Sequence, residues 1–428
     1  MGGKYKNKSY PTMESFIFLY LSSNIALKKR RNMKKYIASI GILLSVYACG
    51  DSNSGNDLSE NTEDPVAVPG DTSEENQRVP DPIEAGVSTA YGFEMVVDGL
   101  DIPWGFTFLP DSSMLITEKN GDIIHFKNGE KIKVSGGPEV YDRGQGGLLD
   151  VVLHPEYESN GWIYFSYASP EGTGEGGNTA IMRAKLEGNK LTSKEVLYKA
   201  SPNTTKGQHF GSRIAFDKNG YLFFSAGERG ERDVNPQDIS RDNGKVYRLN
   251  DDGSIPSDNP FVGEENAVEA IYSYGHRNPQ GMILNPETGE IWVHEHGPKG
   301  GDEINIVKKG ANYGWPVVTY GENYSGTPIT DERSKPGMED PIFYWLPSIA
   351  PSGFAYVTSE KFPELKGKLL VGSLKFQYLE LLDLDGKKIT KRTKLIEDAG
   401  RMRDVRQGPD GDIYVAIEGK GIAKLTNK

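Results

Sequence analysis

Histidine and glutamine residues lie within short glycine-bounded segments, where their side chains could carry acid–base chemistry. Gly144–Asp150 reads Gly-Gln-Gly-Gly-Leu-Leu-Asp, and its Gln145 offers both a donor and an acceptor. Gly207–Arg213 reads Gly-Gln-His-Phe-Gly-Ser-Arg. His209 is a candidate general base in that segment, because imidazole titrates near neutral pH. A buried, hydrogen-bonded structural histidine is the alternative interpretation of His209.

Two further segments combine titratable groups with amides or carboxylates. Tyr274–Gly281 reads Tyr-Gly-His-Arg-Asn-Pro-Gln-Gly, and its Arg277 could bind a carboxylate through two nitrogens. His294–Asn305 contains His294 and His296 with a glutamate between them. On a strand the two histidines would share a face that excludes this glutamate, and the helical spacing of a zinc protease motif is absent. The glycines, proline and carboxylates of the segment favour Ca²⁺ over zinc.

Three more cations stand near the ends of apolar segments. Lys375 follows the apolar run Val371–Leu374, while Arg401 and Arg403 alternate and should therefore point the same way. Each of them alone is typical of a solvated surface cation. If they converge with Arg277, their mutual repulsion requires an anion that carries several carboxylates.

A repeated strand pattern would bring these distant segments together. An apolar strand, a turn rich in Pro, Asp, Asn and Gly, and a second strand occur six times. The copies span 106–117, 151–165, 214–224, 282–293, 353–372 and 405–416. Such repeats predict an all-β fold, a six-bladed β-propeller, since a closed ring protects the edges that a single blade exposes. A pair of β-sandwiches is the alternative.

The composition supports this class and excludes others. The chain has 428 residues, 51 glycines, a hydrophobic content of 36% and a formal net charge of −11. We expect no nucleic-acid partner, because phosphate binding requires a basic surface or stripe and none follows the N-terminal segment. No long amphipathic helix is predicted after Ser88.

The N-terminal segment has the pattern of an export signal. Met33–Cys49 combines a basic start, an apolar run too short to span a bilayer comfortably, and Val-Tyr-Ala-Cys at its end. This end resembles a bacterial lipoprotein box, which predicts lipidation of Cys49. An ordinary signal peptide and a buried first strand are the alternatives. Met33 is a better start than Met1, so residues 1–49 are interpreted as an upstream extension and lipoprotein signal.

Residues 50–88 are predicted to form a disordered acidic tether, since they contain few large apolar residues. The propeller would then occupy residues 89–428. We expect an exported protein, a periplasmic or cell-surface lipoprotein of a Gram-negative-type bacterium, whose only membrane contact is the lipid anchor.

Taken in order, the motifs resemble those of soluble-type quinoprotein sugar dehydrogenases, the glucose/sorbosone dehydrogenase family. The resemblance covers about Tyr91 to Leu425 and includes Asn-Tyr-Gly-Trp-Pro at Asn312–Pro316. It implies a propeller that oxidises an aldose at C1 to the lactone. The implied cofactors are pyrroloquinoline quinone (PQQ), a tricarboxylate, and Ca²⁺. An external electron acceptor, a quinone or a redox protein, is also implied.

The resemblance further implies a role for each motif residue. His209 would be the catalytic base, with Gln145 and Gln208 on the substrate side and Gln145 assisting catalysis. Arg277 would contact the quinone and stabilise charge that develops on it. The remaining implied cofactor contacts are Asn278, His296, Ser348, Lys375, Arg401 and Arg403.

The implied metal contacts form two groups. Gly297 and Pro298 would offer main-chain carbonyls to a Ca²⁺ that also binds the quinone, while Glu303 and Tyr313 resemble a separate structural calcium site. His296 departs from the glutamine of the glucose enzyme, and the short loops resemble the compact aldose-dehydrogenase subgroup. A calcium-dependent propeller hydrolase such as a lactonase, and a non-catalytic binding propeller, remain the alternative functions.

Overall fold

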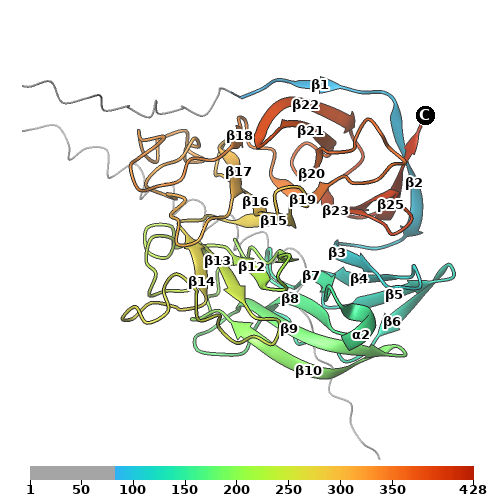
Figure 1. Cartoon of the computed structure of the whole chain (residues 1–428), viewed down its shortest axis with the longest axis horizontal. Coiled ribbons are helices and arrows are strands. Elements are labelled where there is room, and N and C mark those ends of the chain that lie inside the picture. Colours follow the sequence, from blue (N-terminus) through green and yellow to red (C-terminus); the bar gives the residue numbers. More distant parts are fainter. Residues whose placement is uncertain (1–81) are drawn as a thin grey trace, which may run out of the picture. The chain divides into compact units, whose positions relative to one another are not determined.

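The structure, a computed structural model, describes residues 82–428, and these form six β-sheets (Figure 1). The predicted signal, Cys49 and most of the predicted tether lie outside the described residues. The single helix within this part is the one-turn α2 (Tyr157–Asn160). No helix of the described part is long and apolar enough to cross a membrane.

The first three blades are each built from four consecutive strands. Blade 1 consists of β3 (Pro103–Phe108), β4 (Met114–Glu118), β5 (Ile123–Lys127) and β6 (Glu130–Val134). Blade 2 consists of β7 (Leu148–Leu153), β8 (Ile163–Ser169), β9 (Asn178–Glu187) and β10 (Lys190–Lys199). Blade 3 consists of β11 (Ile214–Phe216), β12 (Leu222–Ala226), β13 (Lys245–Leu249) and β14 (Ile271–Tyr274).

The last three blades include two that recruit an N-terminal strand. Blade 4 consists of β15 (Pro279–Leu284), β16 (Ile291–Glu295), β17 (Asp302–Ile306) and β18 (Phe343–Trp345). Blade 5 consists of β19 (Pro351–Tyr356), β20 (Leu369–Ser373), β21 (Leu379–Asp385), β22 (Lys388–Ile396) and β1 (Ala85–Val87). Blade 6 consists of β23 (Met402–Gln407), β24 (Ile413–Ile417), β25 (Gly421–Asn427) and β2 (Tyr91–Asp98).

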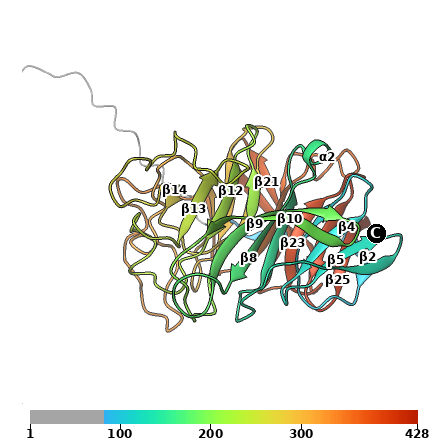
Figure 2. The ribbon, with the colours of Figure 1, turned by 90° about the horizontal axis from the view of Figure 1, so that it is seen from below.

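The first strands of the blades line the centre of the ring. They contact one another in the order β3, β7, β11, β15, β19, β23, and β23 contacts β3 again. Figure 2 shows the same ring from the side. The six predicted repeats coincide with the first two strands of the six blades. The prediction of an all-β, six-bladed propeller is therefore confirmed, and the sandwich alternative is wrong.

Ring closure depends on the pairing of the two ends of the domain. Strand β2 lies antiparallel to β25, with Tyr91 opposite Asn427, so the chain's second strand completes its last blade (Figure 1). Apolar side chains bury the seam between blades 6 and 1. Phe106 and Ile116 pack with Ala416, and all three are fully buried. As the outermost strand of blade 6, β2 covers the outer edge of β25.

The prediction of a disordered tether is wrong for its C-terminal end, which contains β1. Strand β1 pairs in parallel with β22, the outer strand of blade 5, and Ile83 packs against the core between blades 4 and 5. The Arg392 guanidinium donates to the Ile83 carbonyl at 2.8 Å. Few large apolar residues suffice here, because the open edge of β22 offers main-chain hydrogen bonds that do not depend on side chains.

Buried polar side chains join neighbouring blades near the centre. In each case a side chain of one blade hydrogen-bonds a main-chain carbonyl on the first strand, or just before the first strand, of the next blade. The pairs are Thr117 with Leu149, Ser166 with Ser212, Ser225 with Pro279, His294 with Gly353, and Ser352 with Arg403. The first four contacts explain why polar residues occupy second strands that are otherwise largely apolar, whereas Ser352 lies on the first strand β19.

Several of the accepting carbonyls lie at β-bulges. Register shifts occur on β3, β7, β15, β19 and β23, each within the first few residues of the strand. A bulge leaves one residue outside the ladder and redirects its side chain, and such bulges are frequent beside active sites. The bulges therefore place unpaired main-chain groups at one end of the channel.

Candidate functional site

The predicted site residues lie at one end of the ring. Most of them either precede the first strand of a blade, as His209 precedes β11, or follow the second strand, as Lys375 follows β20. Arg403 lies at the start of β23, while Glu303 and Tyr313 lie on and after β17. Because the two strands are antiparallel, the start of one and the end of the other lie together. The fold therefore brings six sequence-distant segments to the same end of the channel.

His209 is held in an unusual backbone conformation by its neighbours. Its φ angle is 57°, in the left-handed region that few non-glycine residues adopt. Its main-chain N–H donates to Gln145 Oε1 at 2.8 Å, and its Nδ1 contacts Glu228 Oε1. Glu228 is almost completely buried, in the loop after β12. Such strain at a buried polar contact is typical of a functional site.

The His209–Glu228 contact determines which ring nitrogen is basic. With Nδ1 donating to a carboxylate, the lone pair of the neutral ring lies on Nε2. Burial lowers the pKa of His209 and the Arg277 cation acts in the same direction, although Glu228 opposes both. The ring is therefore neutral at neutral pH, as a general base must be.

Arg277 and Asn278 present polar groups beside His209. Arg277 donates to the His296 carbonyl at 2.9 Å, and its guanidinium lies 5.3 Å from the centre of the Trp315 ring. Asn278 Oδ1 accepts from the Gly211 N–H at 3.0 Å. Within residues 82–428, Arg277 Nε and Asn278 Nδ2 are buried donors without a protein acceptor. Buried donors of this kind point to a bound acceptor.

The predicted cations of blades 5 and 6 lie on the rim of this end. Arg401 Nε and Arg403 Nε bind opposite oxygens of Glu418, at 2.7 and 3.1 Å, which confirms that the two arginines point the same way. The two guanidinium groups hold the pKa of Glu418 below its usual range although burial opposes this. The Lys375 side chain is exposed, with Nζ 4.9 Å from the centre of the Phe376 ring.

His296 and Ser348 are engaged with protein groups. His296 Nε2 lies 2.7 Å from the Pro351 carbonyl oxygen. The Ser348 hydroxyl donates to Asp302, whose carboxylate also accepts the Gly297, Ile349 and Ala350 N–H groups. Ser348 therefore orders the segments around Asp302, and any contact of its hydroxyl with a cofactor would be additional to this role.

Three of the four predicted metal-binding residues border a small buried space. Gly297 and Glu303 line it together with Glu295 and Tyr313. Burial, and secondarily the neighbouring Glu295 carboxylate, raise the pKa of Glu303 well above its usual range. The Tyr313 hydroxyl donates to the Ile306 carbonyl at 2.5 Å, so only its main-chain carbonyl is suited to a metal. Pro298 is buried next to Gly297.

Two acidic residues escaped the sequence prediction. Glu228 pairs with His209 across 19 positions of sequence, and Glu418 pairs with Arg401 across 17. Glu228 stands in the polar run Gly-Glu-Arg-Gly-Glu-Arg-Asp at 227–233, which was not singled out, and Glu418 follows the apolar strand Ile413–Ile417. The glycines on either side of Glu228 and Arg229, at 227 and 230, were the available signal, because such a pair marks a loop with special backbone conformation.

Comparison with known proteins places this site in a family. The family model for glucose/sorbosone dehydrogenases matches residues 100–425. The aldose sugar dehydrogenase YliI of Escherichia coli (strain K12) is 44% identical over 333 residues, 76% of this chain and 89% of that protein. Quinoprotein glucose dehydrogenase B of Acinetobacter calcoaceticus is 29% identical over 77% of this chain and 85% of its own length.

Solved structures agree with the sequence comparison. The apo-form soluble aldose sugar dehydrogenase from Escherichia coli has a TM-score of 0.76 and 42% identity, and covers 79% of this chain and all of its own. The PQQ-bound aldose sugar dehydrogenase from Streptomyces coelicolor has a TM-score of 0.64 and 27% identity, over 80% of this chain and all of its own. The resemblance inferred from the motifs is confirmed, and the chain belongs to the glucose/sorbosone dehydrogenase family.

Proposed function

We propose that the protein oxidises an aldose at C1 to the corresponding lactone, with PQQ as electron acceptor and with a requirement for Ca²⁺. Family membership and the PQQ-bound relative support the general statement that the domain is a PQQ-dependent sugar oxidoreductase. The finer assignment rests on one observation, the buried His209–Glu228 pair beside unpaired donors of Arg277 and Asn278.

The residues present fit PQQ. Its carboxylates suit the cations Lys375, Arg401 and Arg403, because arginine binds carboxylates through two parallel hydrogen bonds. Its polar ring atoms suit the buried donors of Arg277 and Asn278, which have no acceptor among the described residues. When bound, PQQ would supply the redox chemistry by accepting a hydride from C1 of the sugar.

His209 would perform the proton transfer. Its Nε2 takes the proton of the C1 hydroxyl while the hydride leaves C1, so the carbon becomes a lactone carbonyl and the ring becomes an imidazolium. Glu228 stabilises that imidazolium, because a buried carboxylate at Nδ1 lowers the energy of the charged ring. Gln145 holds the main-chain N–H of His209 and, with Gln208, would contact the sugar hydroxyls.

Calcium would occupy two places. At the quinone, the Gly297 and Pro298 carbonyls would hold an ion that acts as a Lewis acid on the reacting carbonyl. A second ion near Glu303 would relieve the repulsion between this carboxylate and Glu295. No three His, Cys, Asp or Glu side chains within residues 82–428 are grouped to hold a metal. Main-chain carbonyls, such as that of Tyr313, must therefore supply ligands, as Ca²⁺ accepts.

The partners and location are also part of the proposal. The N-terminal signal supports export and lipidation at Cys49, so that the domain would act outside the cytoplasm while held to a membrane only by its lipid. An external quinone or redox protein would then collect the electrons. The substrate is an aldose sugar, and the net charge of −11 supports the absence of a nucleic-acid partner.

Reconstitution tests the proposed function. We expect the purified apo-protein to reduce an artificial dye with an aldose only after PQQ and Ca²⁺ are added, and to release the lactone. A His209→Ala variant should still bind PQQ, seen as quenching of protein fluorescence, but should not reduce the dye. Failure with every aldose tested, or hydrolysis of a lactone without PQQ, would refute the proposal.

A further inference from the structure

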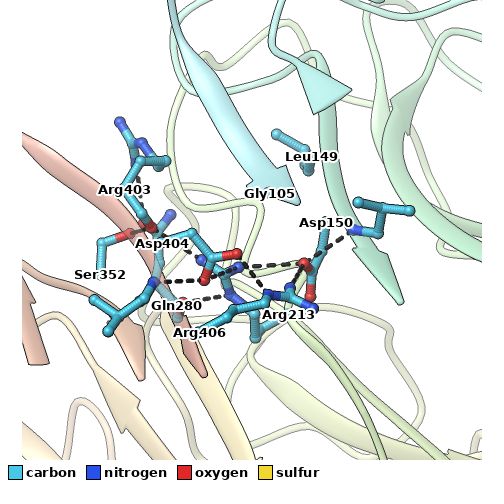
Figure 3. A network of polar contacts seen from close by, with 12 residues as sticks. Gly105, Leu149, Asp150, Arg213, Gln280, Ser352, Arg403, Asp404 and Arg406 are labelled. Atoms are coloured by element: carbon cyan, nitrogen blue, oxygen red, sulfur yellow. Dashed lines mark hydrogen bonds and ion pairs between the residues drawn. The ribbon is translucent and has the colours of Figure 1, made fainter. Parts of the chain in front are cut away.

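A buried group of four charges crosses the channel between blades 2, 3 and 6. Arg213 NH1 lies 3.2 Å from Asp150 Oδ1 and 3.0 Å from Asp404 Oδ1. Arg406 binds the same two carboxylates, at 2.5 and 2.8 Å. Figure 3 shows the two arginines between the two aspartates. We call these four residues the channel plug.

The plug separates the site from the other end of the channel. A cavity of about 350 Å³ lies beyond it, with Arg213, Asp404 and Arg406 in its wall. The other lining residues, such as Leu284 and Gln407, lie near the far ends of the first strands, away from the site residues. The charges of the plug balance, so its ion pairs need no further ligand.

Arg213 has contacts that Arg406 lacks. Its Nε donates to the Gln280 carbonyl at 3.0 Å and its NH2 to the Arg403 carbonyl at 3.2 Å. Gln280 and Arg403 are the residues left out of the ladder at the bulges of β15 and β23. Their carbonyls are therefore free to accept from a side chain, and one guanidinium fixes both of them.

These two residues also meet through their side chains. Arg403 NH1 lies 3.4 Å from Gln280 Oε1, and Ser352 Oγ donates to the Arg403 carbonyl at 2.8 Å. The Arg403 side chain extends away from the plug (Figure 3). Arg213 and Ser352 thus hold the main chain from which this side chain departs, while Glu418 binds its guanidinium.

We propose that Arg213 is a positioning residue for PQQ binding, because it orients Arg403 from inside the plug. This inference rests on the proposed function, which assigns Arg403 to a PQQ carboxylate. Arg406, which binds the same aspartates, has only the structural role of balancing the plug. The two arginines therefore provide a matched pair for an experiment.

The test compares Arg213→Lys with Arg406→Lys in the full-length apo-protein with saturating Ca²⁺. Isothermal titration gives the Kd for PQQ, and thermal denaturation of the apo-protein gives Tm. Both variants should lower Tm, because each loses the forked ion pairs of the plug. Only Arg213→Lys should raise the Kd for PQQ, by about ten-fold or more, since a charged hydrogen bond to Arg403 is lost. We expect Arg406→Lys to stay within about two-fold of wild type.

Two further variants keep the result interpretable. Ser352→Ala removes the other hydrogen bond to the Arg403 carbonyl, and it should weaken PQQ binding even if Arg213→Lys does not fold. Arg403→Gln tests the assignment directly. If Arg213→Lys and Arg406→Lys had equal Kd values for PQQ while Arg403→Gln bound PQQ more weakly, the proposed role of Arg213 would be overturned. The assignment of Arg403 would stand. An unchanged Kd in Arg403→Gln would overturn the assignment of Arg403 and this inference with it.

Discussion

Replacement of Glu228 by glutamine should slow sugar oxidation without weakening PQQ binding. The Glu228 carboxylate is almost completely buried and contacts His209 Nδ1. When glutamine removes the charge, water therefore cannot take over its interaction with the imidazolium. A hydrogen bond to a charged partner contributes roughly 1.5–3 kcal/mol. In the proposed mechanism the imidazolium forms as the proton is transferred, so this energy would be lost mainly in the transition state. We expect kcat/KM to fall by about 10- to 150-fold.

The pH dependence gives a second readout of the same change. In the wild type, kcat/KM should decline as the pH falls through the pKa of His209, which lies below its usual value because of burial and Arg277. Glu228 raises that pKa, so its removal should shift the acidic limb to still lower pH. The rate at the plateau should nevertheless be lower, because the imidazolium has lost its partner.

Glu231→Gln is the matched control for this experiment. Glu231 lies three residues further along the same loop, is exposed, and pairs with Lys206 instead of His209. Stopped-flow dye reduction with saturating PQQ and Ca²⁺ would compare the two variants from about pH 4 to 9. If Glu228→Gln kept kcat/KM within about two-fold of Glu231→Gln, and the acidic limb did not move, the assigned role of Glu228 would be wrong.

Three further predictions concern stability. Deletion of residues up to 88 removes β1 and the Ile83 contacts, and should lower Tm by about 2–5 °C in differential scanning fluorimetry while sugar oxidation is retained; an unchanged Tm would show that β1 adds nothing. Ser225→Ala leaves the buried Pro279 carbonyl without its partner, and should cost about 1–3 kcal/mol in urea denaturation, whereas the exposed Ser240→Ala should not. Calcium at 100 times its Kd should stabilise the apo-protein by about 2.7 kcal/mol, and Glu303→Gln should abolish most of that gain. An equal gain in both proteins would show that Glu303 is not a metal ligand.

Most of the fold could be predicted from the repeats, because each repeat pairs strands that are close in sequence. A turn of a few residues joins β3 to β4, so composition and spacing reveal the hairpin. The pairing of β2 with β25 joins segments separated by almost the whole domain. Short edge strands such as β1 leave no apolar pattern, since their partner supplies main-chain groups alone. For these reasons the six blades were predictable from the sequence. The closure of the ring by β2 and the extra strand β1 of blade 5 were not.

The site residues divide in the same way. His209 and Arg277 stand in glycine-bounded motifs, so their position at one end of the channel could be inferred. Glu228 and Glu418 lie 19 and 17 positions from their partners, and only the fold shows that they pair with His209 and Arg401. The hydroxyl of Ser348 was predicted to contact the cofactor, but a sequence cannot show that Asp302 competes for it.

The pairing of β2 with β25 also determines when the ring can close. Strand β2 is synthesised before any complete blade, whereas β25 is the last strand to be made. This pairing can therefore form only after Gly421–Asn427 has been made. The same last blade carries Arg401, Arg403 and their partner Glu418. We therefore expect a chain truncated before β25 to lose this closure and to bind the proposed cofactor poorly.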